Sequence, residues 1–142
     1  MVVNADLLKK HASQLKVTKD SGADYYKELF TKHPELGDLY GAPDPDMIAR
    51  AQKFIMFAMN ELQFFISLPI NFGQERPWRS ALSNFKEHYG DVDVPLKEFN
   101  KTIDAFLVVM AKHAGGLNAE QKKSWEELLA KAYSDMKAWG WL

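Results

Sequence analysis

The feature that most constrains the fold of this chain is the spacing of its apolar residues, which repeats every 3.6 residues or so along almost the whole sequence. The repeat is clearest in a stretch that carries Leu96, Phe99, Ile103, Phe106, Leu107 and Met110. No segment alternates apolar and polar residues as a half-buried strand does, and no internal repeat is visible. We therefore predict one all-α domain over residues 1–142, with six to seven helices.

Helix start and stop signals divide the chain further. They predict helices over residues 4–17, 22–33, 46–68, 77–90, 96–114 and from 118 onward. Asn4 is the expected cap of the first helix, and Asn118 with Gln121 resembles a capping box. Residues 35–40 are expected to form a tight turn, and the proline-rich stretches 41–46 and 69–77 to form loops.

Composition excludes several classes of function. The 142 residues have a net charge of −1, which gives no electrostatic reason to expect binding to nucleic acid or to an anionic membrane. The chain has no cysteine, so disulfides, iron–sulfur clusters and thiol catalysis are excluded. Neither a secretory signal nor an apolar span long enough for a membrane helix is visible, so a cytoplasmic location is expected. Motifs for phosphate loops, His-Glu-x-x-His metal sites and nucleophile elbows are also missing.

His88 is the residue whose position points to chemistry. It lies three residues after Phe85, on the apolar face of the helix predicted over 77–90, and seven residues before Pro95. A neutral imidazole that faces an aromatic interior is suited to ligate a metal held in an apolar macrocycle, and haem is the obvious candidate. The alternative is a half-buried histidine that makes a hydrogen bond near a helix end.

Four landmarks follow one another in a fixed order. They are the phrase Ser-Gly-Ala-Asp-Tyr-Tyr-Lys-Glu-Leu-Phe-Thr-Lys-His-Pro (21–34), an aromatic Tyr40, a long apolar helix, and His88 with Pro95. Across nearly the whole chain this order resembles the globin family. The phrase itself, the segment 45–52 and the closing helix around Trp125 are most similar to nematode-type invertebrate globins.

The resemblance implies a haem b cofactor and a set of roles for individual residues. His88 matches the proximal ligand of the iron, and Tyr26 matches a distal tyrosine that would donate a hydrogen bond to the gas. Arg50 falls on the distal position and Phe54 on the apolar position over the iron. The remaining residues that the resemblance places at the haem pocket are Tyr40, Ala51, Lys53, Phe85, Val94 and Phe99. Ala51 also matches the small residue at which the long helix crosses the second one.

Three departures from the family pattern affect ligand binding. Tyr40 stands where the family has phenylalanine, and Arg50 where it usually has histidine or glutamine. The segment between Pro34 and Arg50 is short, so a small helix found there in relatives is expected to be lost. We favour an outward Arg50 that pairs with a haem propionate, with Lys53 sharing that work, because an unpaired buried guanidinium is costly. An inward Arg50 that donates to the gas is the alternative.

The sequence therefore predicts a globin that reversibly binds O₂ or another diatomic gas. We do not expect it to be an enzyme, and the sequence leaves open whether it is a monomer or a homo-oligomer. The first rival is a haem redox catalyst or sensor, with peroxidase-like or nitric-oxide dioxygenase activity, suggested by Arg50 and Tyr40. The second rival is a haem-free helical module that binds an apolar ligand. The other histidines, His11, His33 and His113, are expected to be structural or to face solvent.

Overall fold

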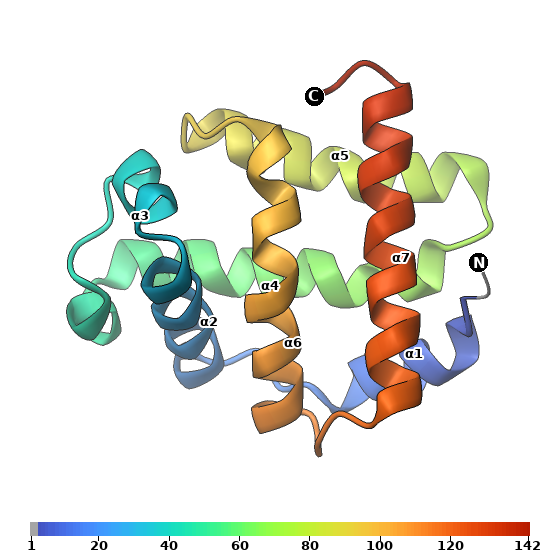
Figure 1. The fold of residues 1–142 in the computed structure, drawn as a ribbon, viewed down its shortest axis with the longest axis horizontal. Coiled ribbons are helices and arrows are strands. Elements are labelled where there is room, and N and C mark those ends of the chain that lie inside the picture. Colours follow the sequence, from blue (N-terminus) through green and yellow to red (C-terminus); the bar gives the residue numbers. More distant parts are fainter. Residues whose placement is uncertain (1–2) are drawn as a thin grey trace.

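The computed structural model describes residues 3–142 and confirms the all-α prediction: this part of the chain forms seven α-helices and two 3₁₀-helices, without strands (Figure 1). The elements are α1 (Ala5–Gln14), α2 (Lys19–Lys32), α3 (Pro34–Tyr40), η1 (Pro45–Arg50), α4 (Gln52–Asn71), α5 (Glu75–Asp91), η2 (Leu96–Lys101), α6 (Thr102–His113) and α7 (Ala119–Ala138).

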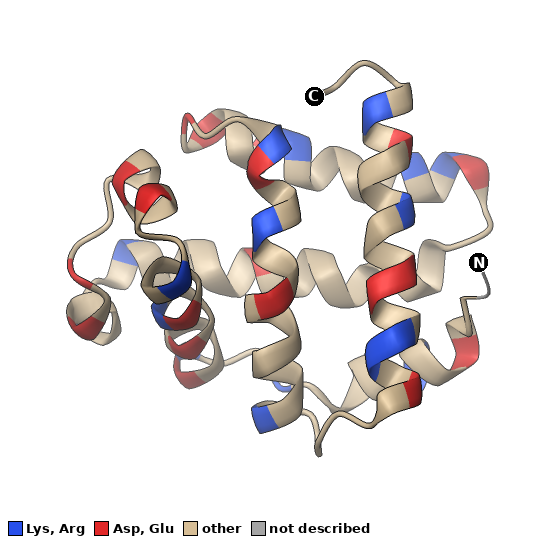
Figure 2. Cartoon of the chain, viewed as in Figure 1, with Lys and Arg blue, Asp and Glu red and all other residues tan. Residues whose placement is uncertain are grey.

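The helices cross one another in two directions. In Figure 1, α6 and α7 run side by side in front of α4 and α5, while α2 and α3 lie at one end. A pair of stacked rings joins α4 to α6, with the ring centroids of Phe65 on α4 and Phe106 on α6 4.5 Å apart. The indole N–H of Trp78 on α5 donates to Asp135 on α7 over 2.8 Å. Basic and acidic residues are mixed over the helices (Figure 2), and α4 contains only Lys53 and Glu61 as charged residues.

Two of the predicted helix caps are confirmed. The Asn4 side chain accepts a hydrogen bond from the backbone of Leu7, and Asn118 with Gln121 forms the full capping box at the start of α7. A second capping box, formed by Thr18 and Ser21, starts α2 three residues earlier than the predicted start at 22. Two hydroxyl residues three positions apart thus set a helix start that apolar spacing alone does not reveal.

The predicted boundaries of the long apolar helix are wrong at both ends. Residues 46–50 belong to η1, and α4 begins only after Ala51. At the other end α4 continues through Pro69 to Asn71, so the predicted 69–77 loop shrinks to a short turn before Glu75. A proline near a helix end removes one backbone donor. The Asn71 amide donates to the Ser67 carbonyl over 3.0 Å and helps to hold this last turn.

The segment between α2 and α4 is also more ordered than predicted. Residues 35–40 form most of α3, an α-helix with Pro34 at its first position and Gly41 in the left-handed conformation after its end. The 3₁₀-helix η1 then follows, so the expected tight turn over 35–40 and the expected loss of a small helix before Arg50 are both wrong. Because α3 ends at Tyr40, it carries that side chain into the interior.

The crossing of α2 and α4 depends on Gly22. A Cβ atom at Gly22 would lie 3.0 Å from Cγ of Met59 and 3.4 Å from the Ile55 carbonyl oxygen. The two helix backbones therefore meet at Ile55 and Met59. The sequence prediction put this crossing at Ala51, which instead caps the N-terminus of α4. The true crossing sets α2 opposite the middle of α4, and this brings Tyr26 over Glu61.

Within residues 3–142, no helix is both long and apolar enough to cross a membrane.

Candidate functional site

His88 lies in the last turns of α5 and points into the interior, with 8% of its surface exposed. The helix continues beyond it to Asp91, one residue past the predicted end at Gly90. Its Nε2 atom lies 2.7 Å from Oε2 of Glu61 on α4. The side chain singled out by the sequence is therefore buried, and its inward nitrogen is bound to a carboxylate from the same chain.

Glu61 is the centre of the site. Its side chain is 0% exposed and is hydrogen-bonded to four residues that lie on three different helices. The Tyr25 hydroxyl donates to Oε1 over 2.9 Å. The hydroxyls of Tyr26 and Tyr40 donate to Oε2, the latter over 3.0 Å, beside the His88 imidazole. The four groups are divided unequally, with one at Oε1 and three at Oε2.

The directions of these hydrogen bonds define the role of Glu61. Three tyrosine hydroxyls donate to its two oxygens. Nε2 of His88 is the fourth group at the carboxyl, and it donates to Oε2 in the tautomer that carries the ring hydrogen on Nε2. A buried carboxylate is tolerated only when it is fully bonded in this way.

The tyrosines are held in their protonated form. Burial raises the pKa of Tyr25, Tyr26 and Tyr40 well above the ordinary tyrosine value, and the negative charge of Glu61 raises it further. A tyrosinate next to Glu61 would place two negative charges in a region with little water. The three hydroxyls therefore remain hydrogen-bond donors throughout the neutral pH range.

Aromatic rings surround the imidazole of His88. The rings of Phe57 and Phe64 on α4 meet it edge to face, with centroid distances of 5.8 Å and 6.0 Å. Tyr89 lies 5.9 Å away on the same helix as His88. On the other side of the carboxylate, Tyr26 and Tyr40 pack against each other with centroids 5.4 Å apart. The polar cluster is thus enclosed by rings.

The structure brings together part of the predicted pocket. Tyr26, Tyr40 and His88 meet at Glu61. Phe85 and Phe99 are fully buried, with ring centroids 5.0 Å apart, and Val94 is buried in the turn after α5. Their predicted part in holding haem stays a prediction.

The predicted residues near the start of α4 lie away from the Glu61 cluster. Arg50 is exposed on η1, which agrees with the outward orientation expected for it, and its pairing with a haem propionate stays a prediction. Lys53 is exposed, with Nζ 5.8 Å and 5.7 Å from the ring centroids of Phe54 and Phe57. Phe54 is buried beside Phe57, but the residue that faces His88 is Glu61.

A shift of seven residues explains this difference. Seven residues make almost two helical turns, so positions seven apart lie on the same face of a helix. If each predicted role is assigned to the residue seven positions later, the role of Phe54 falls on Glu61. The role of Ala51 then falls on Ala58, which is fully buried. The same shift exchanges Arg50 for Phe57, which contacts His88. The apolar pattern alone fits both registers.

Sequence reasoning missed Glu61, although a signal was present. Glu61 lies three residues after Ala58 and four before Phe65, so it occupies a core position of α4. A charged residue at such a position requires partners. Tyr25 was missed for another reason: nothing in the sequence of α2 shows that two adjacent tyrosines both turn inward.

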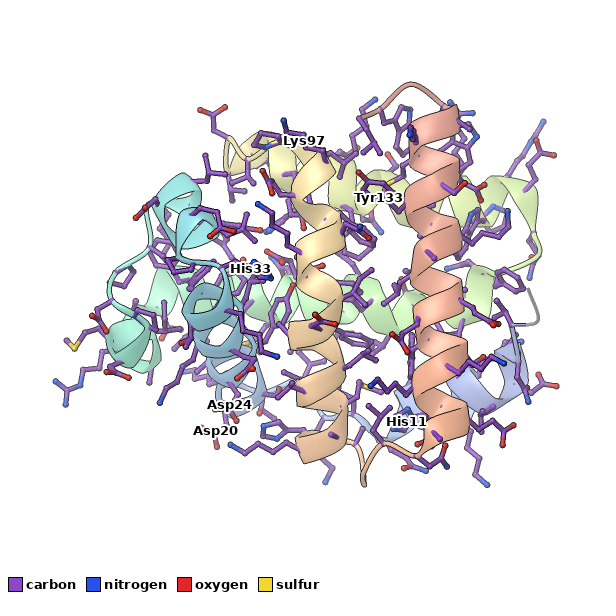
Figure 3. The ribbon with its side chains drawn as sticks, in the orientation of Figure 1. His11, Asp20, Asp24, His33, Lys97 and Tyr133 are labelled. Atoms are coloured by element: carbon purple, nitrogen blue, oxygen red, sulfur yellow. The ribbon has the colours of Figure 1, made fainter. Side chains whose placement is uncertain are left out.

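The remaining histidines have structural surroundings. His11 is 1% exposed and accepts from the indole of Trp125 through Nδ1, so Nε2 donates to the Gly116 carbonyl over 2.8 Å. Figure 3 labels it on α1, near the start of α7. His113, at the end of α6, contacts Asp24 of α2 over 2.7 Å. Among the residues from 3 to 142, no three histidine or acidic side chains are grouped to hold a bare metal ion.

Comparison with known proteins supports one family. The globin family model matches residues 23–136, which include every residue of the Glu61 cluster. Searches of curated proteins and of solved structures find no match to this chain.

Proposed function

Because this chain belongs to the globin family, whose members typically bind haem, we propose that it holds one haem b through His88 and reversibly binds O₂ or another diatomic gas. The observation that carries the proposal is the inward, buried position of His88 on α5, opposite α4, within the matched region. The proposed activity is binding, without catalytic turnover.

The side chains around His88 suit a haem in their chemistry. The imidazole is a common protein ligand of haem iron, and the aromatic rings of Phe57 and Phe64 offer apolar contacts to a macrocycle. The described residues do not provide a cluster for a bare ion, so the porphyrin would have to bring the remaining iron ligands. The contact between Nε2 and Glu61 would have to open, because the same atom would serve as the ligand.

A bound haem would supply an iron with one position free for the gas. The chain would supply the surroundings of that position. The hydroxyls of Tyr26 and Tyr40 approach from the side of α4 that faces His88, and both are hydrogen-bond donors. Phe57 and Phe64 would keep water out, which slows oxidation of the iron.

The spectrum of the protein tests the haem proposal. We expect purified protein supplied with haem to become red, with ferric, ferrous and oxygenated spectra that change in His88→Ala. His113→Ala removes a histidine that also contacts a carboxylate but lies far along the chain, and it should leave the spectra unchanged. Identical spectra for His88→Ala and the parent protein would contradict the proposal.

The rate of gas release tests the role of Tyr26. We expect Tyr26→Phe to speed O₂ dissociation about tenfold, because one hydrogen bond of about 1–1.5 kcal/mol is lost. Tyr133→Phe, on α7, is the matched control and should leave the rate unchanged. An unchanged rate in Tyr26→Phe would count against this assignment.

The alternative function, a haem redox catalyst or sensor, rested on Arg50 and Tyr40. Because Arg50 is exposed on η1, only Tyr40 still supports it. Steady-state turnover with peroxide, well above that of free haem, would favour the alternative.

A further inference from the structure

Nε2 of His88 has two mutually exclusive uses. In the tautomer that donates to Glu61, Nε2 carries a hydrogen, and a protonated ring nitrogen has no lone pair for iron. To ligate iron, the hydrogen must move to Nδ1 or leave, and the Glu61 carboxylate must withdraw. The two arrangements use the same atom and cannot exist together in one molecule.

The arrangement with Glu61 is complete in itself. Every buried side-chain nitrogen or oxygen of the described residues has a hydrogen-bond partner. The carboxylate has one partner at Oε1 and three at Oε2, so both of its oxygens are bonded within the protein. Rings close the space around the imidazole, since Phe57 and Phe64 both contact it.

The donors come from separate parts of the chain. Tyr25 and Tyr26 lie on α2, Tyr40 ends α3, and His88 lies on α5. Each of these elements is therefore bound to the middle of α4 through the Glu61 side chain. Fully satisfied buried networks of this kind make a fold rigid.

We propose that Glu61 is an internal competitor of haem: it binds His88, ties α2, α3 and α5 to α4, and makes the haem-free protein a closed, folded state. The competition with haem rests on the proposed function, whereas the closed haem-free state rests on the cluster alone. Haem affinity is then set by how readily Glu61 releases His88.

Haem titration of variants tests the competition. In Glu61→Leu the partner of Nε2 is gone, and we expect haem to bind about ten- to a hundredfold more tightly, the range that one charge-assisted hydrogen bond provides. Glu61→Gln keeps the shape of the side chain and should lie between the two. Asp24→Asn is the matched control, because it removes another contact of 2.7 Å between a histidine and a carboxylate, far from His88 along the chain.

The haem-free proteins provide a second, independent measurement. Nitrogen NMR of the histidine rings should show His88 protonated at Nε2 in the parent protein. Urea unfolding should show that Glu61→Gln is less stable than the parent. If Glu61→Leu fails to fold, Glu61→Gln serves as the test variant in both the haem titration and the unfolding experiment.

The outcomes separate the inference from the proposed function. Glu61 variants that bind haem no more tightly than the parent, while the parent binds it through His88, would overturn the competition. If neither the parent nor any variant binds haem, the proposed function fails, and the unfolding data alone test the closed haem-free state. A parent protein without haem that is unfolded, or no more stable than Glu61→Gln, would overturn the closed state.

Discussion

The hydrogen bond from Tyr25 to Glu61 allows the contribution of the buried carboxylate to stability to be measured. Tyr25→Phe removes one hydroxyl and keeps the ring, including its edge contact with Phe65 at a centroid distance of 6.1 Å. Tyr25 is 0% exposed and is the donor that Oε1 of Glu61 uses, over 2.9 Å. After the change, Oε1 of the buried Glu61 side chain has lost the donor that it uses.

The size of the effect follows from this geometry. A hydrogen bond to a charged group contributes about 1.5–3 kcal/mol, so we expect Tyr25→Phe to lower the free energy of unfolding by about 2–3 kcal/mol. A loss of 2 kcal/mol lowers Tm by about 6 °C in a domain of this size. Tyr40→Phe is the matched comparison. Oε2 keeps the donors Tyr26 and His88 after that change, and we expect a loss of about 1 kcal/mol.

Urea unfolding of haem-free protein, followed by tryptophan fluorescence, measures both losses. The slope of free energy against urea concentration must be the same in all variants for the comparison to hold. Repeating Tyr25→Phe in a Glu61→Leu background completes a double-mutant cycle, in which the loss should nearly vanish because the hydroxyl no longer has a charged partner. A Tyr25→Phe loss no larger than that of Tyr40→Phe would refute the assignment of Oε1 to Tyr25.

Three further predictions concern stability. Stability should fall as pH rises above about 10. The unfolded chain ionises its tyrosines there, whereas the three tyrosines bound to Glu61 have raised pKa values and stay protonated in the folded chain. A free energy of unfolding that stays constant up to about pH 11 would contradict this. His11→Ala should cost about 2–4 kcal/mol in urea unfolding, because Trp125 and Gly116 both lose a partner. Gly22→Val should cost about 1–3 kcal/mol in thermal unfolding through its clash with Met59, and an unchanged Tm would show that α2 can shift.

Apolar spacing predicted where the helices lie, because most of their burial comes from one face. The predicted helices over 77–90 and from 118 onward differ from α5 and α7 by two residues or fewer at their starts. Errors fell where something other than burial sets the boundary. The end of α4 is one such place, since side-chain hydrogen bonds continue the helix past Pro69. A proline is a strong stop signal in the sequence, and its effect depends on contacts that the sequence does not show.

The candidate site was predicted only in part, because its central interaction joins residues far apart in the chain. His88 could be recognised from its own helix, since it lies on the apolar face defined by Phe85. The charge on the core face of α4 could also be recognised, yet its partners could not, because neither tyrosine on α2 indicates by its spacing that it reaches α4.

Adjacent residues on a helix point about 100° apart, so Tyr25 and Tyr26 would ordinarily face different neighbours. They reach the same side chain because a carboxylate has two oxygens, and each hydroxyl binds a different one. This explains why aspartate or glutamate is suited to the centre of the cluster and a hydroxyl or single carbonyl is not. The register of α4 follows as well. A seven-residue shift would place Phe54 opposite His88 and leave three buried hydroxyls without an acceptor, so the cluster selects the one register in which every donor is bonded.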